Sequence, residues 1–401
     1  MLNLNLFIVL KKYYSLLLLC SVLTLLFITA VNGQTQSPIT ITHQPYIQGL
    51  TGTSVSVIWT TNRPAIAWVE LAPDDSSHFY RVERPRFFAT NYGFKNVGTV
   101  HQVNLEGLTP GTTYRYRVYS TEVLKHVGVN VDYGKTVATG VYQQAPLQFK
   151  TLGNSASTKF AVINDIHGRN EVMQTLLDHS NLPAMDFIVF NGDMANSLLS
   201  EDQMFQDFMD TAIKRFASEK PMYYARGNHE TRGPFAVSYP AYFPTPTGKL
   251  YYQFRQGDAA FIVLDCGEDK PDSDMEYSGI VDMDNYRTQQ AKWLAKAVED
   301  PAFISARYKV VICHMPPFGG WHGELEILEK FVPILNKAGV QIMLSGHLHK
   351  HIIQKANNQV HFPIIVNSNN NLIQVDLNPS RGLFKVLDQQ GKTVDEVLVK
   401  P

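Results

Sequence analysis

The chain has almost no net charge, and this absence limits the partners that it can have. Its 35 lysine and arginine residues balance 36 aspartate and glutamate residues, which leaves a formal net charge of -1. Nucleic acids and anionic membranes bind net basic surfaces, so the charge indicates neither of them as a partner. No internal repeat, charge run or low-complexity segment appears in the sequence. The expected partner is a small molecule or an ester group.

What remains is an ordinary globular composition, with 44% hydrophobic and 18% charged residues over 401 positions. This length allows two domains and a sizeable hydrophobic core.

The first residues predict export. Lys11 and Lys12 precede an apolar run, residues 15–30, which ends in the small-residue sequence Val31-Asn32-Gly33. This order of segments is typical of a signal peptide, so we expect residues 1–33 to be removed and the protein to be secreted or periplasmic. A retained membrane anchor is the alternative, because the run is close to the lower length limit of a spanning helix. A lipid anchor at Cys20 is disfavoured, because apolar rather than polar residues follow it.

Cysteine is scarce, with three residues in the chain. Removal of the signal peptide would leave Cys266 and Cys313, an even number that can pair in an oxidising compartment. Both residues follow apolar strand-like runs, so two buried free thiols are an equal alternative.

Residues 34–152 have the pattern of an all-β sandwich. Val55, Val57 and Trp59 recur at every second position, which places them on one face of a strand. A turn rich in Gly, Thr and Pro then leads into Tyr114 and Tyr116, and this arrangement resembles the tyrosine corner of fibronectin type III-like domains. We interpret Trp59 and both tyrosines as core residues rather than ligand-stacking residues. A short polar segment, residues 151–159, predicts the connector to the second domain.

Residues 153–401 alternate strand-like and helical patterns, which predicts an α/β domain. Helical spacing of apolar residues follows Ser200, whose capping-box sequence predicts a helix start, and recurs from Leu325 to Leu335. The apolar strand-like runs are 160–163, 187–190, 222–225, 261–264, 310–312 and 342–344.

Five motifs rich in metal-donor side chains follow these runs in one order. They are Asp165-Ile166-His167, Gly192-Asp193, Gly227-Asn228-His229, His314 and Gly346-His347-Leu348-His349. Ligand sites of α/β sheets form where strands end, so the donors are expected to converge. Any one histidine is more often an ordinary core or loop residue, but the joint occurrence in order favours a two-metal phosphoesterase.

The spacing within the motifs suggests separate roles. Asp165 and His167 are two residues apart, and an extended backbone would point both side chains the same way. Asn228 and His229 are adjacent and would point apart, so Asn228 can offer an amide oxygen to a metal while His229 stands beside the substrate. Asp193 is the natural bridge, because paired ions in phosphatases lie roughly 3.5 to 4 Å apart.

These motifs resemble those of the calcineurin-like metallophosphoesterase superfamily, and with the β domain in front the chain is similar to purple acid phosphatases. The resemblance implies a layered αββα sandwich for the second domain and a hydroxide, shared by two metal ions, that attacks phosphorus in line. It also implies that His229 assists the leaving group and that His322 contacts substrate. Arg232 and Arg226 flank the Gly-Asn-His-Glu motif and can reach phosphate oxygens, with a solvated surface position as an equal alternative for each. The implied ligands are Asp165, His167, Asp193 and His349 for one ion, and Asp193, Asn228, His314 and His347 for the other.

Two positions depart from the purple acid phosphatase pattern. His167 stands where that family has glycine, and Asn196 stands where it has a metal-bound tyrosine. Without the phenolate the ferric colour should be absent, and a site of imidazoles and carboxylates suits Mn, Zn or Fe(II) at least as well.

The leading hypothesis is an exported dinuclear metal hydrolase that cleaves phosphate monoesters of small molecules. A phosphodiesterase with the same metal centre is the nearest alternative, because His167 is shared with diester-cleaving relatives. A secreted, non-catalytic binding module is a second alternative, which the complete ligand set disfavours.

Replacing the predicted bridge tests this hypothesis. We expect Asp193→Ala to abolish turnover and dinuclear metal occupancy together, measured by aryl phosphate hydrolysis and elemental analysis. Near-native turnover in this variant would show that the bridge assignment is wrong.

Overall fold

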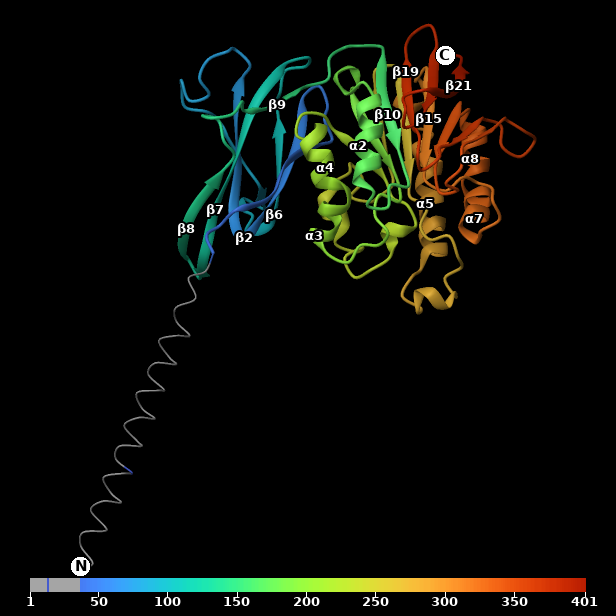
Figure 1. Cartoon of the computed structure of the whole chain (residues 1–401). Coiled ribbons are helices and arrows are strands. Elements are labelled where there is room, and N and C mark those ends of the chain that lie inside the picture. Colours follow the sequence, from blue (N-terminus) through green and yellow to red (C-terminus); the bar gives the residue numbers. More distant parts are fainter. Residues whose placement is uncertain (1–12, 14–36) are drawn as a thin grey trace, which may run out of the picture. The chain divides into compact units, whose positions relative to one another are not determined.

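The computed structural model describes Tyr13 and residues 37–401 (Figure 1). The predicted signal peptide, residues 1–33, lies outside the described residues except for Tyr13, as does Cys20. None of the helices in the described part combines the length and the apolar character that crossing a membrane requires. The residues from Thr40 to Pro401 form one compact unit.

The first part of this unit is β-rich, as the sequence predicts. Its main strands are β1 (Ile41–Gln48), β2 (Ser54–Pro73), β3 (Arg86–Phe88), β6 (Gly98–Glu106), β7 (Thr113–Val127), β8 (Asn130–Ala138) and β9 (Leu147–Lys150). A small hairpin joins β4 (Thr90–Asn91) to β5 (Phe94–Lys95). The long strand β2 pairs with β1 and β6 through its first half and with β7 and β3 through its second half. The register shift between Thr60 and Ala65 lies where the strand changes partners within one seven-stranded sheet.

The core of this β-rich part confirms the interpretation of its aromatic residues. Trp59 and Tyr116 are fully buried, and Trp59 Nε1 donates to Ser120 Oγ at 2.9 Å. The backbone N–H of Thr109 donates to the Tyr114 hydroxyl at 3.0 Å. This bond is the backbone contact that the predicted tyrosine corner requires.

Two mixed sheets form the second part of the unit. Within residues 158–399, one sheet has the order β12-β11-β10-β19-β20-β21 and the other β13-β14-β15-β16-β18-β17. The strands of the first are β10 (Thr158–Ile163), β11 (Phe187–Asn191), β12 (Met222–Ala225), β19 (Leu372–Leu377), β20 (Gly382–Leu387) and β21 (Thr393–Val399). Those of the second are β13 (Tyr252–Gln256), β14 (Ala259–Leu264), β15 (Tyr308–Cys313), β16 (Ile342–Ser345), β17 (Ile352–Gln354) and β18 (Ile364–Val366). All six strand-like runs of the sequence lie in these strands.

Helices cover the outer faces of both sheets. The chain from Glu201 to Ala217 is one continuous helical segment. In it the π-helical turn η2 (Phe205–Met209) separates α3 (Glu201–Met204) from α4 (Asp210–Ala212), and a second π-helical turn, η3 (Ile213–Ala217), follows α4. The other helices are α2 (Asn170–His179), α5 (Met283–Ala297), α6 (Pro301–Ile304), α7 (His322–Lys330) and α8 (Val332–Ala338), and the 3₁₀ turns are η1 (Leu182–Ala184), η4 (His229–Thr231), η5 (Tyr239–Tyr242) and η6 (Met275–Tyr277).

Both predicted helices are present, with one difference. Ser200 Oγ accepts the backbone N–H of Gln203 at 3.2 Å, which confirms the predicted helix start. The apolar stripe from Leu325 to Leu335 falls on two helices, because Pro333 at the start of α8 cannot continue the hydrogen bonds of α7.

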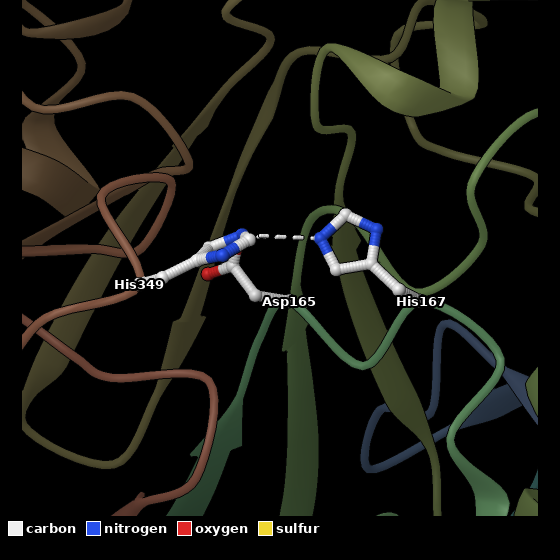
Figure 2. Close-up of side chains that lie close together, drawn as sticks. All are labelled: Asp165, His167 and His349. Carbon is white, nitrogen blue, oxygen red and sulfur yellow. Dashed lines mark hydrogen bonds and ion pairs between the residues drawn. The ribbon is translucent and has the colours of Figure 1, made fainter.

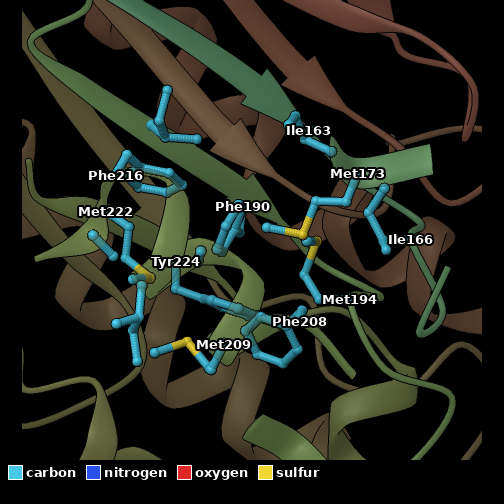
Figure 3. Close-up of a cluster of buried hydrophobic side chains, with 14 of the residues drawn as sticks. Ile163, Ile166, Met173, Phe190, Met194, Phe208, Met209, Phe216, Met222 and Tyr224 are labelled. Atoms are coloured by element: carbon cyan, nitrogen blue, oxygen red, sulfur yellow. The ribbon is translucent and has the colours of Figure 1, made fainter. Parts of the chain in front are cut away.

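The apolar side chains form three layers around the two sheets. One layer lies between the sheets and includes Phe160, Phe187 and Phe261. A second packs α2 and the 201–217 segment against the first sheet, where Phe190 and Phe208 meet (Figure 3). The third packs α5, α7 and α8 against the other sheet. The order of layers is the predicted αββα sandwich.

Both cysteines of the described part are free and buried, in the third of these layers. Of the two alternatives for Cys266 and Cys313, the structure has the pair of free thiols. Burial raises the pKa of the Cys266 thiol well above its usual value, which makes it a poor nucleophile.

Phe187 tests the layer between the sheets. It is fully buried, stacks on Phe160 at 4.8 Å between ring centroids and meets Phe261 edge-on at 5.6 Å. We expect Phe187→Ala to lower the free energy of unfolding by about 3–5 kcal/mol, measured by chemical denaturation. Leu398→Ala, on a side chain that is 67% exposed, is the control and should change it by less than about 0.5 kcal/mol. An equal effect of both changes would contradict the layer assignment.

Candidate metal centre

The candidate ligands sit in unusual backbone conformations. Of the nine non-glycine residues with positive φ in the described part, five are candidate ligands: Asp165, His167, Asp193, His347 and His349, with φ between 50° and 69°. Such left-handed conformations cost about 1–3 kcal/mol each in bulky residues and concentrate at functional sites. The convergence of donors was predicted, but the predicted extended backbone is wrong. The chain instead turns sharply after each strand and aims two side chains at one place.

Asp165, His167 and His349 form the first group of donors (Figure 2). The Nε2 atoms of the two histidines face each other at 3.2 Å, and His349 Nε2 lies 3.2 Å from Asp165 Oδ1. The other carboxylate oxygen, Oδ2, accepts the backbone N–H of His347 at 3.0 Å and the side chain of Asn164. Asp165 is thereby held with Oδ1 directed at both imidazoles.

Asp193 lies between this group and a second one. Its Oδ2 is 3.0 Å from His314 Nε2 and 3.9 Å from the Nε2 atoms of His167 and His229. Its Oδ1 accepts the backbone N–H of His229 at 3.0 Å. A Cβ atom at Gly227 would overlap Asp193 Oδ1, so the glycine of that motif is needed for this close approach.

His314, His347 and Asn228 complete the second group with Asp193. His314 is fully buried, and its Nδ1 lies 2.7 Å from the carbonyl oxygen of Asn191, to which it can only donate. This bond fixes the ring with Nε2 directed at Asp193, the nitrogen from which His314 would ligate a cation. His347 Nδ1 lies 3.1 Å from Asn228 Oδ1. Asn228 and His229 are in a helical turn rather than the predicted extended segment.

These donors fit a pair of bound cations. Asp165 Oδ1 is buried and forms no hydrogen bond within residues 37–401. Two ring nitrogens that face each other and a carboxylate oxygen that accepts no hydrogen bond are satisfied together by a cation among them. Asp193 connects the two groups. It lies in one donor cluster with His167, a member of the first group, and in another with His314 and His347 of the second. The arrangement therefore has two adjacent places for cations with one carboxylate between them.

The electrostatics of the buried charges agree with this fit. Burial alone would lower the pKa of His314, but the carboxylates of Asp193 and Asp165 raise it to about 10. Burial opposes the ionisation of Asp193, yet His314 and the other histidines hold its pKa below the usual range. Burial lowers the pKa of His347 to about 4, which keeps the imidazole neutral. A cation would replace the proton that His314 holds here, since a ligating imidazole is deprotonated.

The remaining predicted residues differ in their contacts. His229 is beside the centre, and its Nδ1 lies 2.8 Å from the carbonyl oxygen of Asn196. Arg232 forms ion pairs with Glu268 at 3.1 Å and Asp269 at 3.4 Å. His322 Nε2 lies 2.8 Å from Asp284 Oδ1.

Arg226, a predicted candidate for phosphate contact, is 8% exposed and pairs with Asp265 at 2.9 Å. Its guanidinium is therefore occupied by a carboxylate inside the protein.

Glu230 supports the centre, and the sequence reasoning assigned it no role. Its buried carboxylate accepts four backbone N–H groups, from Asp193 at 2.9 Å, Met194 at 2.6 Å, Ala195 at 3.1 Å and Gly227 at 3.0 Å. These bonds hold the Asp193 loop against the Gly227 turn. The sequence signal that could have identified this role is the presence of a charged residue within a motif that carries candidate ligands.

Glu324 is a second residue that the sequence reasoning did not select. It is fully buried near the start of α7, with Oε1 at 3.7 Å from His347 Nε2 and Oε2 accepting the backbone N–H of Trp321 at 2.8 Å. Burial raises the pKa of Glu324 to about 7. Glu324, rather than the neighbouring His322, is thus the residue of α7 that faces a candidate ligand.

The chain matches two family profiles. The calcineurin-like phosphoesterase profile matches residues 158–351, and the profile of the purple acid phosphatase N-terminal domain matches residues 43–133. In fold, the structure is similar to that of purple acid phosphatase PPD1 from yellow lupin (Lupinus luteus) seeds. The TM-score is 0.63 at 14% sequence identity, over 90% of this chain and 74% of the lupin chain.

Two curated relatives come from Arabidopsis thaliana. Probable purple acid phosphatase 20 is 23% identical over 275 residues, which cover 63% of this chain and 55% of the relative. Purple acid phosphatase 18 is 23% identical over 264 residues, which cover 61% and 56%. The chain therefore spans about half the length of these relatives.

Glu230 provides the test of how the centre is held. In Glu230→Gln an amide NH₂ replaces one acceptor oxygen and faces backbone N–H groups, so the Asp193 loop should loosen. We expect about 10- to 100-fold weaker metal binding, measured by metal titration of the folded variant.

Glu171→Gln, an exposed change on α2 with the same loss of charge, is the control. Unchanged metal affinity in Glu230→Gln would show that these four bonds do not support the centre.

Proposed function

Because the chain combines a purple acid phosphatase N-terminal domain with a calcineurin-like phosphoesterase domain, we propose that it is an exported, dinuclear metal-dependent phosphatase acting on phosphate monoesters. One observation carries this proposal. Asp193 Oδ2 lies within 3.0 to 3.9 Å of ring nitrogens from three separate loops, those of His314, His167 and His229. A carboxylate so placed can serve two ions at once.

The proposed ligands follow from the two groups of donors. Asp165, His167, Asp193 and His349 would hold one ion, and Asp193, Asn228, His314 and His347 the other. Imidazole, carboxylate and amide donors suit Mn, Zn or Fe. Asn196 replaces the tyrosine ligand of purple acid phosphatases, and its side-chain amide donates to the His167 carbonyl at 3.4 Å. The bound ions would neutralise phosphoryl charge and lower the pKa of water toward neutrality.

His229 is proposed to serve the leaving group. Its Nδ1 donates to the Asn196 carbonyl, which fixes the ring and directs Nε2 toward Asp193 at 3.9 Å. A proton held on Nε2 would be available to the departing alkoxide or phenoxide oxygen.

Substrate contacts by Arg232 and His322 stay predictions. The ion pairs of Arg232 with Glu268 and of His322 with Asp284 would have to open or be shared for either side chain to reach a phosphate. A phosphate contact would then gain charge-assisted bonds at the cost of these existing ones.

A phosphodiesterase on the same centre is the second candidate. His167, in place of the glycine of purple acid phosphatases, is the observation that favours it, since its Nε2 faces His349 and adds an imidazole to the first group. The two candidates share the metal ions and differ in whether the pocket accepts a second ester substituent.

Metal removal tests the proposal. We expect protein purified without added metal to contain about two ions per chain by elemental analysis. Hydrolysis of p-nitrophenyl phosphate should be lost on chelation and return when Mn, Zn or Fe is added back.

The substrate comparison separates the candidates. Faster turnover of bis(p-nitrophenyl) phosphate than of the monoester would favour the phosphodiesterase. Turnover of neither ester after add-back would contradict both and favour a non-catalytic binding module.

A further inference from the structure

A second cluster of donor side chains lies outside the proposed centre. It joins His43 on β1 to Glu201 and Asp202 at the start of α3. The ligand atoms of these residues lie within 4.8 Å of one another. We propose that His43, Glu201 and Asp202 form a further site for a divalent cation of the zinc class.

The contacts that orient the His43 ring are those typical of a metal-binding histidine. Its side chain is 9% exposed, and its ring stacks on Phe205 with 3.6 Å between centroids and 9° between planes. Nδ1 lies 3.0 Å from Asp210 Oδ1. A ligating histidine commonly donates its other ring N–H to a carboxylate, which fixes the tautomer and raises the basicity of the free nitrogen.

The free nitrogen of His43 points into the cluster without a hydrogen-bond partner. Nε2 is buried and forms no hydrogen bond within residues 37–401. A buried lone pair without a partner costs free energy that a bound cation would recover. The nearest carboxylate oxygen, Asp202 Oδ1, lies 3.8 Å from Nε2, too far for a hydrogen bond.

The spacing fits zinc after a small adjustment. Metal–ligand distances of about 2.0–2.1 Å in a tetrahedron place neighbouring ligand atoms about 3.3 to 3.4 Å apart. Asp202 must therefore approach Nε2 by roughly half an ångström, and its side chain is 80% exposed and free to rotate. Glu201 is already oriented by the Tyr242 hydroxyl, which donates to its Oε2. One imidazole and two carboxylates leave a fourth position for water.

The charges of this cluster also differ from those of an ordinary surface network. Asp284, His322 and Glu326 form another donor group of similar composition. There, Arg287 pairs with both carboxylates, which neutralises them within the protein. At His43, by contrast, Asp202 and Asp210 have no lysine or arginine partner within residues 37–401 and lie beside the imidazole alone. Three carboxylates around one imidazole favour a divalent cation.

A cation here would join distant parts of the chain. His43 belongs to the first strand of the β-rich part, and Glu201 begins the helical segment that follows the Asp193 loop. Binding to the folded state alone would stabilise this junction by linkage.

Zinc stoichiometry tests the site. We would dialyse the metal-loaded wild-type protein and Glu201→Gln/Asp202→Asn against buffered Zn²⁺ and measure zinc and total metal by elemental analysis. The wild-type protein should hold about one ion more than the double variant, and zinc should raise its thermal midpoint further. Asp210→Asn should weaken zinc binding at this site about 10- to 100-fold.

The control is Glu171→Gln/Asp178→Asn, which removes two exposed carboxylates from α2 with the same change in net charge. It should keep the wild-type zinc content. Asp202→Asn alone, at an 80% exposed side chain, is the second variant and should also bind zinc more weakly with unchanged circular dichroism. Equal zinc content in the wild-type protein and both folded variants would overturn the proposal.

The test is independent of the proposed phosphatase centre. Asp193→Ala should lose ions from that centre and keep the zinc held by His43. If the centre binds no metal at all, the difference of about one ion between the wild-type protein and the double variant should persist.

Discussion

The contact between Asp193 and His314 connects the two sheets at the candidate centre. Asp193 follows β11 of one sheet and His314 follows β15 of the other, and their side chains meet at 3.0 Å. A second bond, from His314 Nδ1 to the Asn191 carbonyl, fixes the ring on the same strand end. Apolar side chains of both sheets, among them Val189, Ile312 and Leu344, pack between the strands that lead to these loops. A change of packing there would move the donors of both groups together.

Several hydrogen bonds offset the free-energy cost of burying these charges inside the protein. Positive φ angles at five candidate ligands are unfavourable, and buried carboxylates lose hydration. Glu230 binds four backbone N–H groups around Asp193, and Asn164 and the His347 backbone bind Asp165. The surrounding bonds leave selected oxygen and nitrogen atoms facing inward. A cation bound to those atoms would stabilise this arrangement. Without one, the stability of the rest of the fold has to offset the free-energy cost of the buried, unpaired groups.

The same reasoning separates donor clusters that look alike in composition. His43 and His322 both contact an aspartate, but Arg287 already neutralises the carboxylates around His322. Neighbouring charge and the direction of the free ring nitrogen distinguish these clusters, rather than the number of donors. Neither property can be obtained from local sequence, because Asp202 and Asp210 lie more than 150 positions after His43.

The sequence by itself determined the two-part fold and the identity of the candidate ligands. Alternating and helical apolar patterns report local periodicity, and the strand-like runs from Phe160 to Leu344 all became strands. The five motifs were readable because their donors follow those strands directly. Only the tertiary structure decided how the donors converge, through left-handed turns at Asp165 and His347 rather than an extended backbone. It also decided that Glu230 binds the Asp193 loop, that Glu324 faces His347 and that Arg226 and Arg232 are already paired, because these contacts form only when separate segments of the chain fold together.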